Sequence, residues 1–392
     1  MTIVFFSDSY TPYVSGVVRS LELTARELTR RGHRVALVAP GYPGYRSPGV
    51  DSTGAYVLRL PSLPVPGQGV FRLPVIPLAP LRLPEGYRPD IVHAHSPFLT
   101  GTLALRTARR YGVPLVFTHH TLYHEYVHYA LLPAGLTRPL VLRTVGRFCR
   151  QATAVIAPTP SIARLVRQLY GPVGNVATIP TGIDLSAFAG LDRSWLRGRF
   201  AIPAGAPVVI HVGRLAREKN VHMLMQALRR LLEELPALHA VVAGGGPFLA
   251  GMRAATSEPP FAGRLHLTGP LAPSEVPRHL AGADLFLTAS TTETQGLVAV
   301  EAMAAGLPVV APEAGGIPDV VRSGQDGLLV TARPEALAEA ARGLLEQPHR
   351  LRRLAEHALA RSREFGVEHT VSRLEQFYQR LTSARACGAG QG

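Results

Sequence analysis

A single lysine marks the first candidate site. The chain of 392 residues holds 41 basic residues, and Lys219 is the only lysine among them. Arginine is a planar fork suited to bidentate anion contacts, whereas lysine is a flexible point charge. All the remaining basic residues of the chain are arginine, and the one lysine lies in segment 213–220, five residues after Arg214. This exception predicts a phosphate-binding loop in that segment. The alternative interpretation is a surface lysine without a ligand.

Two carboxylates form the second candidate site. Glu293 and Glu301 lie in and after a polar loop that runs into a helix expected to begin near Leu297. Free N–H groups at the start of such a helix form an anion site. Because carboxylates repel a diphosphate, the two glutamates are better explained as acceptors for sugar or ribose hydroxyls. For Glu301 the alternative is a glutamate stabilised by the helix dipole.

Further candidates also follow expected strands. The glycine-rich turn 244–247 would let the backbone approach a ligand, which makes Gly246 a candidate contact. In the first half, His95 ends one strand, and His119 and His120 follow the next. Histidine can act as an acid, a base or a hydrogen-bond donor, but an isolated histidine after a strand is more often a packed residue. That packed interpretation is the one we favour for His119.

The elements that must position these residues alternate between strand and helix. Short runs rich in valine and isoleucine are typical of parallel strands covered on both faces. The expected strands of the first half are 3–6, 34–38, 91–95, 115–118 and 154–157, with helices at 18–31 and 101–110. The pattern restarts with strands 208–212, 240–243, 265–267, 285–288, 308–310 and 327–330, and helices 221–235 and 297–305. We predict an α/β fold of two doubly wound, Rossmann-like domains, with ligands beyond the carboxyl ends of the strands.

Proline and glycine suggest where the domains divide. The expected domains are 1–184 and 185–367, followed by a C-terminal helix, returning to the first domain, and a flexible tail in 368–392. Segment 180–207 is broken by proline and glycine and suits a hinge better than a core element. The proline-rich segment 61–84 is expected to be an extended surface loop, and 383–392 a disordered tail.

Charge and cysteine content narrow the classes of partner. The formal net charge is +14, and residues 1–189 hold nineteen arginines against eight acidic residues. This asymmetry indicates anionic lipid headgroups or nucleic acid as partners, although a coding bias toward arginine would also explain it. Cys149 and Cys387 give neither a disulfide framework nor a metal-ligand spacing. This cysteine content fits the reducing cytosol. We also expect no signal peptide and no membrane-spanning run.

Three motifs in this order resemble a known family. They are Gly213-Arg214-Leu215 with Glu218-Lys219-Asn220, the Glu293-x7-Glu301 spacing inside 293–310, and Pro180-Thr181-Gly182-Ile183-Asp184. Together they resemble the family-4 retaining glycosyltransferases, and the resemblance covers almost the whole chain. It implies a GT-B fold, in which two Rossmann-like domains face a central cleft.

The resemblance also implies roles for residues of the second half. Arg214 and Lys219 would bind the diphosphate of a nucleotide-sugar donor and neutralise the leaving group. Glu301 would hold the ribose, and Glu293 the transferred sugar. Backbone N–H groups would cover the sugar and the phosphates, those of Gln295, Gly296 and Leu297. Phenylalanine is commonest in the family at position 295, so Gln295 favours a subgroup.

In the first half, the resemblance places Gly16 in the first strand-to-helix loop, where its backbone would face the donor phosphates. The family often has a second glycine where this chain has Ser15. His120 aligns with the family histidine that meets the transferred sugar. Transfer would proceed by front-face displacement, in which a departing phosphate oxygen helps to take the acceptor proton. The resemblance implies no cofactor and no metal.

Segment 118–129, paired with 293–296, looks most like the bacterial diacylglycerol glucosyltransferases. This likeness would put His95, Tyr123 and Tyr126 near the acceptor. One helical stretch carries arginines with apolar residues interleaved, namely Arg138, Arg143, Arg147 and Arg150. Such a segment could lie on an anionic membrane surface, or it is an ordinary core helix with a solvated arginine face.

The interpretation is therefore a retaining glycosyltransferase that moves a hexose from UDP-glucose to a lipid such as diacylglycerol, as a cytoplasmic protein on the inner face of the membrane. Donor base, sugar and oligomeric state stay open, and phosphatidylinositol or a soluble sugar is an alternative acceptor. A nucleotide-sugar 2-epimerase would share the architecture, but the paired motifs argue against it. A sugar-binding protein would need a secretion signal. A nucleic-acid binder explains the arginines alone, because the aromatic residues do not cluster with them.

Overall fold

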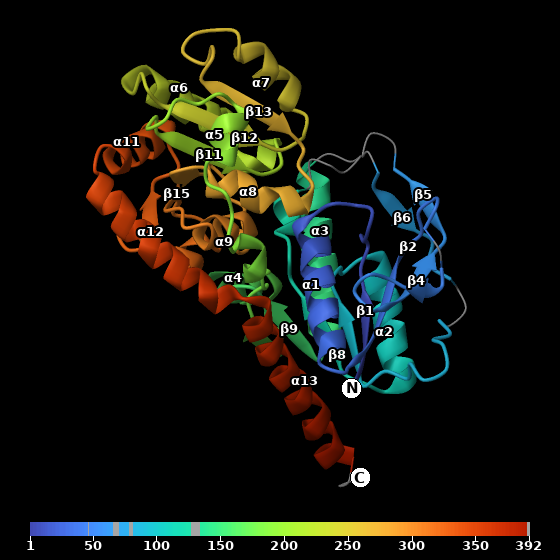
Figure 1. Cartoon of the computed structure of the whole chain (residues 1–392). Coiled ribbons are helices and arrows are strands. Elements are labelled where there is room, and N and C mark those ends of the chain that lie inside the picture. Colours follow the sequence, from blue (N-terminus) through green and yellow to red (C-terminus); the bar gives the residue numbers. More distant parts are fainter. Residues whose placement is uncertain (46, 66–69, 78–80, 127–133, 390–392) are drawn as a thin grey trace. The chain divides into compact units, whose positions relative to one another are not determined.

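The computed structural model describes residues 1–45, 47–65, 70–77, 81–126 and 134–389. The chain divides into two compact units, Met1–Gly182 with Val367–Gly392 and Ile183–Gly366. Each unit is built on its own largely parallel sheet with helices on both faces (Figure 1). The chain leaves the first unit after Gly182 and returns to it after Gly366.

The first unit has an eight-stranded sheet in the order β10-β9-β8-β7-β1-β2-β4-β3, parallel except between β3 and β4. The strands are β1 Thr2–Phe6, β2 Arg34–Pro40, β3 Gly49–Val50, β4 Tyr56–Leu60, β7 Ile91–Ala94, β8 Leu115–Thr118, β9 Ala154–Ala157 and β10 Asn175–Thr178. The helices are α1 Gly16–Arg30, α2 Leu99–Tyr111, α3 Ala134–Gln151, α4 Pro160–Tyr170 and α13 Val367–Ala389, with a 3-10 turn η1 at Tyr123–Glu125.

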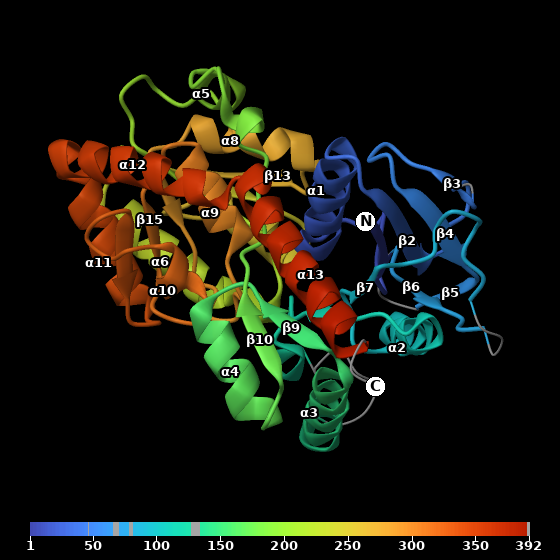
Figure 2. The same ribbon diagram turned by 90° about the horizontal axis from the view of Figure 1, so that it is seen from below.

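Alternate strand residues of this sheet fill two cores, because successive side chains point to opposite faces. Ile3 and Phe5 pack with α1 and α13, whereas Val4 and Phe6 pack with α2, α3 and α4. Helix α13, the last element of the chain, lies against α1 (Figure 2). Strand order reverses between β1 and β7, so the loops after these strands flank the point where such sheets bind ligands.

The second unit has a six-stranded parallel sheet in the order β13-β12-β11-β14-β15-β16. Its strands are β11 Val208–Val212, β12 His239–Ala243, β13 Leu265–Gly269, β14 Leu285–Leu287, β15 Val309–Pro312 and β16 Gly327–Val330. Its helices are α5 Trp195–Arg199, α6 Val221–Glu234, α7 Leu249–Ala255, α8 Val276–Ala281, α9 Leu297–Ala304, α10 Ile317–Val320, α11 Pro334–Leu345 and α12 Pro348–Ser362, with 3-10 turns η3 Leu185–Phe188, η4 Arg217–Lys219, η5 Pro273–Glu275 and η6 Arg363–Phe365. The order reverses between β11 and β14, which places the two predicted motif loops on either side of the switch point.

The expectation of a hinge over 180–207 is wrong for most of that segment. Ile183, Leu196 and Ile202 are buried in the core of the second unit. These apolar residues are separated by prolines, glycines and arginines, so the sequence has no periodic pattern that would predict their burial. Instead of a linker, the segment consists of short stretches, including α5, that each bury one apolar side chain in the core.

Two other segments also differ from expectation. In the proline-rich segment, β5 Ser62–Pro64 and β6 Arg72–Pro74 form an antiparallel pair, with residues 66–69 and 78–80 outside the described part. Proline is tolerated there because a two-stranded ribbon consists of edge strands only. The expected tail from residue 383 is helical through Ala389, as the end of α13.

Candidate active site

Backbone hydrogen bonds fix the loop that follows β11. The N–H of Leu215 donates to the carbonyl of Gly245 at 2.9 Å, which ties this loop to the turn after β12. Asn220 adopts a left-handed conformation with φ +51°, and its side-chain amide donates to the carbonyl of Ala289 at 3.1 Å and to Oγ1 of Thr291 at 3.0 Å. The loops after β11 and β14 are therefore held side by side.

This arrangement brings Lys219 and Glu293 together. Nζ of Lys219 lies 2.5 Å from Oε1 of Glu293, and their side chains are 20% and 23% exposed. Burial by itself raises the pKa of Glu293, but the Lys219 ammonium outweighs burial and holds that pKa below its ordinary value. In the absence of a ligand, the two predicted residues neutralise each other.

Arg214 lies on the same loop. Its Nη1 atom is 4.0 Å from Oε1 of the buried Glu218, and its side chain is 44% exposed. The loop therefore carries a second cation, the solvent-exposed Arg214, which lies next to the buried carboxylate of Glu218.

The loop after β14 ends where predicted, at Leu297, the first residue of α9. Gly296 precedes the helix with φ +81°, a conformation that disfavours side chains, and a Cβ there would run into Ile317. Gln295 is 2% exposed, so its side chain is part of the interior. Glu301 lies within α9 and is partly exposed.

Gly246 has a packing reason of its own. Its φ is +148°, and a Cβ at this position would run into the carbonyl oxygen of Leu215. The glycine is needed for the turn after β12 to press against the loop after β11. The structure therefore explains this glycine without any ligand.

His211, in β11, is a site residue that sequence reasoning missed. Its Nδ1–H donates to the carbonyl of Leu287 at 3.0 Å, because a carbonyl can only accept. Burial lowers the pKa of His211 to about 4, and Lys219 and Glu293 are close enough to contribute. Its Nε2 has no partner among the described residues. A polar residue inside an apolar strand was the available signal.

In the first unit, the loop after β1 leads into α1, whose first residue is Gly16. Ser15 caps this helix: its Oγ accepts from the N–H of Val18 at 3.2 Å. The departure from the family glycine thus gives α1 a side-chain cap. The half-buried Asp8 accepts from the N–H of Thr100 at 2.8 Å and so caps α2 from the end of β1.

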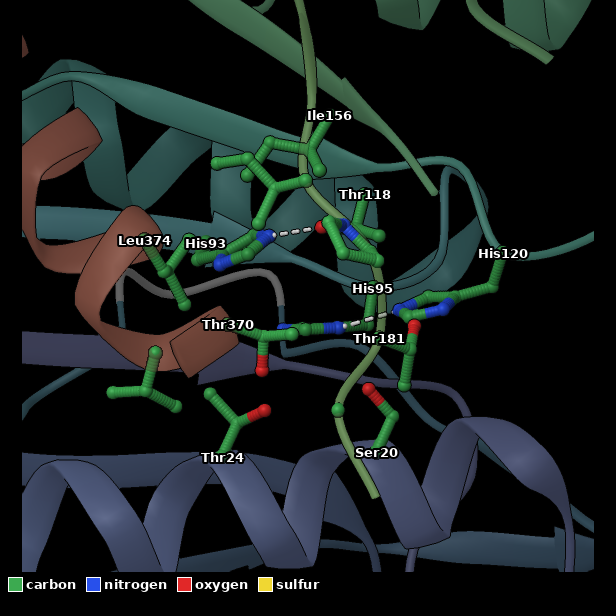
Figure 3. Close-up of a pocket in the computed structure, with 14 residues that line it drawn as sticks. Ser20, Thr24, His93, His95, Thr118, His120, Ile156, Thr181, Thr370 and Leu374 are labelled. Atoms are coloured by element: carbon green, nitrogen blue, oxygen red, sulfur yellow. Dashed lines mark hydrogen bonds between the residues drawn. The ribbon is translucent and has the colours of Figure 1, made fainter. Parts of the chain in front are cut away.

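His93 in β7, His95 directly after β7 and His120 after β8 lie close together in the first unit (Figure 3). Nδ1 of His95 and Nε2 of His120 are 2.8 Å apart, and the two rings are stacked with centroids 5.1 Å apart. They line a cavity of about 30 Å³ under α1 and α13. His119 points to the other face of the sheet, where its Nε2 lies 3.1 Å from the Tyr170 hydroxyl, so the packed interpretation describes its position.

The predicted acceptor tyrosines belong to the segment that follows β8. Tyr123, in η1, packs edge-on against Phe98 with ring centroids 5.2 Å apart. Tyr126 follows η1 and is partly exposed. Residues 127–133 lie outside the described part of the chain, and with them Val127, His128 and Tyr129 of the subgroup segment.

Helix α3 separates its apolar and basic residues. Val145 and Phe148 are buried in the core, which removes them from any surface role. Leu136 and Leu140 are instead 70% and 57% exposed. Arg143 and Arg147 are also exposed on this helix.

The other two arginines of α3 have protein partners. Arg138 lies 3.9 Å from Glu125, and Nη1 of Arg150 donates to the carbonyl of Tyr170 at 2.7 Å. Arg143 and Arg147 are therefore the better candidates for an external anion. In the described part of the chain, no helix combines the length and the apolar content that crossing a membrane requires.

Two family descriptions match the chain in succession. Glycosyltransferase Family 4 matches residues 14–187, and Glycosyl transferases group 1 matches residues 192–361. The chain is 29% identical to alpha-monoglucosyldiacylglycerol synthase of Streptococcus pneumoniae, over 96% of this chain and 85% of the relative. It is 32% identical to D-inositol 3-phosphate glycosyltransferase of Nocardia farcinica, over 94% of this chain and 86% of the relative.

Solved structures share the fold. The Anabaena protein HepE in complex with UDP and glucose superimposes with a TM-score of 0.76 at 23% identity, over 97% of this chain and 99% of the other. Sucrose-phosphate synthase from Thermosynechococcus elongatus gives a TM-score of 0.79 at 20% identity, over 97% and 99% of the two chains. These matches confirm the GT-B fold, and together with the inositol-phosphate relative they establish that the chain belongs to the family-4 glycosyltransferases.

Proposed function

We propose that this glycosyltransferase moves glucose, with retention, from UDP-glucose to the free hydroxyl of a diacylglycerol at an anionic membrane surface, without a metal ion. The observation that carries the proposal is the Lys219–Glu293 pair at the switch point of the second unit. It supplies, side by side, a cation for a diphosphate and a carboxylate for a sugar hydroxyl.

The donor half of the reaction follows from this pair. When the bond between sugar and diphosphate breaks, negative charge grows on the leaving phosphate. Lys219 and Arg214 stabilise that charge from fixed positions, which lowers the barrier because the interaction strengthens in the transition state. Glu293 accepts from the sugar while Lys219 donates to the phosphate, so two ligand contacts replace the single resting contact. The departing phosphate oxygen takes the acceptor proton, and no side-chain nucleophile is required.

The acceptor half is supported by α3. Leu136, Leu140, Arg143 and Arg147 follow one another at helical spacings of four, three and four residues, so they form one exposed stripe. Exposed leucines next to arginines suit the interface of an anionic bilayer, where the leucines enter the acyl region and the arginines meet headgroups. A relative named alpha-monoglucosyldiacylglycerol synthase supports the same acceptor class.

A soluble inositol phosphate is the second candidate acceptor. The relative named D-inositol 3-phosphate glycosyltransferase is 32% identical over nearly the whole chain, against 29% for the diacylglycerol synthase. The arginine excess of the first half would favour this anionic acceptor as well.

Radiolabelled UDP-glucose tests the proposal. The enzyme is incubated with vesicles that contain diacylglycerol and anionic lipid, with the same vesicles lacking diacylglycerol, and with inositol 3-phosphate in solution. We expect label in the lipid fraction only when diacylglycerol is present, and far less of it with Lys219→Ala. Label in a soluble inositol product would instead identify inositol phosphate as the acceptor. A folded enzyme that releases no label from UDP-glucose under any condition would contradict the donor assignment.

A further inference from the structure

Three histidines stack on the face of the first sheet that lies under α1 and α13. Ring centroids are 4.2 Å apart between His93 and His95, and 5.1 Å apart between His95 and His120. His93 and His95 share a face because they are two positions apart on one extended segment. The pairing of Ala94 with Phe117 in β7 and β8 brings His120 alongside them.

His93 is fixed at both ring nitrogens. Its Nδ1 lies 2.5 Å from the hydroxyl of Tyr378 on α13, and its Nε2 lies 2.7 Å from Oγ1 of Thr118. These two contacts fix the ring of His93, and the ring of His95 packs against it. Through Tyr378, the last helix of the chain contributes to this arrangement.

His95 and His120 share one proton in their mutual hydrogen bond. Burial lowers the pKa of His95 well below its ordinary value, and it lowers the pKa of His120 to about 3, so both rings are neutral. A neutral imidazole carries one N–H, which means that one ring donates and the other accepts. The tautomers of the two rings are therefore coupled, and whichever nitrogen of His95 is protonated decides whether Nδ1 of His120 is a donor or an acceptor.

The tautomer of His95 also depends on the partner of its second ring nitrogen, Nε2. His95 is 4% exposed, and its Nε2 has no partner among the described residues. Leaving a buried polar atom without a partner destabilises the folded protein. His95 also lines the cavity of about 30 Å³, together with the hydroxyl-bearing residues Ser20, Thr24, Thr181 and Thr370 (Figure 3). A polar cavity of this size has room for about one or two water molecules.

We propose that His95 is a positioning residue for His120, and that water bound in this cavity satisfies Nε2 of His95. The water gives Nε2 of His95 a hydrogen-bond partner, stacking on His93 holds the plane of the His95 ring, and His95 imposes on His120 the tautomer that matches its own. The role of His120 at the transferred sugar rests on the proposed function. The fixed tautomer itself is a property of the ligand-free protein.

Two substitutions of His95 separate positioning from packing. Asn carries a polar atom near the place of Nδ1 but does not reach the place of Nε2, whereas Leu fills space without a hydrogen bond. We expect His95→Leu to lower kcat for UDP-glucose turnover 10- to 100-fold with an unchanged KM for the donor, and His95→Asn to recover part of the loss. His119→Leu removes a neighbouring buried histidine on the opposite face and should alter stability but not kcat. Wild-type kcat in a folded His95→Leu enzyme would overturn the proposal.

A spectroscopic measurement needs no substrate. With 15N-labelled histidine, we expect the two ring nitrogens of His120 to show one protonated and one unprotonated shift in the wild-type protein, and averaged shifts in His95→Leu. Averaged shifts in the wild-type protein would overturn the proposal and leave the glycosyltransferase assignment intact. Conversely, an absence of transfer to any acceptor would count against the proposed function without changing these spectra.

Discussion

The ammonium of Lys219 donates to the carboxylate of Glu293 across 74 positions of sequence, at 2.5 Å. The contact exists because loops from neighbouring parallel strands, β11 and β14, end at the same edge of one sheet. Two groups that are expected to bind different parts of one ligand thus hold each other in its absence. The Lys219 ammonium lowers the pKa of Glu293 and keeps its carboxylate charged, so the pair is ready for a ligand that offers both a phosphate and a hydroxyl.

Replacing Lys219 by Ala should reduce kcat by roughly 100- to 1,000-fold, the scale of removing one charged or oxyanion-stabilising donor. Arg217, exposed on the same 3-10 turn, provides the matched control, because Arg217→Ala removes one positive charge from the same surface. Steady-state turnover of UDP-glucose measures both variants. Equal losses in the two variants would mean that general charge, rather than the Lys219 position, accounts for the effect.

Acid should destabilise this protein through its buried histidines. Burial lowers the pKa of His211 and of His119 to about 4, below the ordinary value of 6.5. Between these values the unfolded chain binds a proton that the folded chain does not, so stability falls as the pH drops from about 6.5 to about 4. Each such histidine contributes up to about 1.4 kcal/mol per pH unit in this window.

Urea midpoints between pH 7 and pH 4.5 check this expectation. His211→Phe should lower stability at neutral pH, because the Leu287 carbonyl loses its donor, yet it should flatten the pH slope. His349→Phe, at an exposed position of α12, should leave the slope as it is. A slope unchanged by His211→Phe would show that this ring is not neutral in the folded protein.

The sequence predicted those parts of the molecule that repeat a simple pattern. Valine-rich runs located the six strands of the second sheet and five of the eight strands of the first, and missed β3, β4 and β10. The polar residues after β11 and β14 were expected to lie together, and they do, because parallel strands end at a common edge. Leu297 was the expected start of α9 because a polar loop gives way to apolar residues there.

Contacts that depend on strand register or on a single buried side chain could not be predicted from the sequence. His95 meets His120 only because β7 and β8 are adjacent and aligned, which no local pattern of either segment states. Leu196 and Ile202 enter a core from a segment that reads as a linker. His211 stands out in the sequence only as a polar residue inside an apolar strand, and its hydrogen bond to the Leu287 carbonyl depends on the pairing of β11 with β14.

Gly246→Ala should destabilise the second unit by about 1–3 kcal/mol, because strained backbone and a clash with the Leu215 carbonyl add together. Gly263 is the control: it also has positive φ, at +71°, but a Cβ there meets nothing within 4 Å. Gly263→Ala therefore reports the strain of a left-handed backbone without a clash, of roughly 1 kcal/mol. Chemical unfolding of both variants gives the difference, and equal losses would rule out the clash as the reason for glycine at 246.

The stripe on α3 should govern vesicle binding. Reversing two exposed arginines, as Arg143→Glu with Arg147→Glu, removes roughly 1 kcal/mol of attraction to an anionic surface per arginine and adds repulsion, so the affinity for anionic vesicles should fall at least about 30-fold. The same change of charge at Arg352 and Arg353, exposed on α12 of the second unit, leaves the net charge equal and should have a much smaller effect. Salt should weaken wild-type binding, since exposed charges are screened, and should bring the wild type closer to the α3 variant. Leu136→Asp with Leu140→Asp tests the apolar half, which salt does not screen. If the α12 variant lost as much binding as the α3 variant, net charge alone would attract the protein to the vesicle, and the stripe would have no special place in contact with the bilayer.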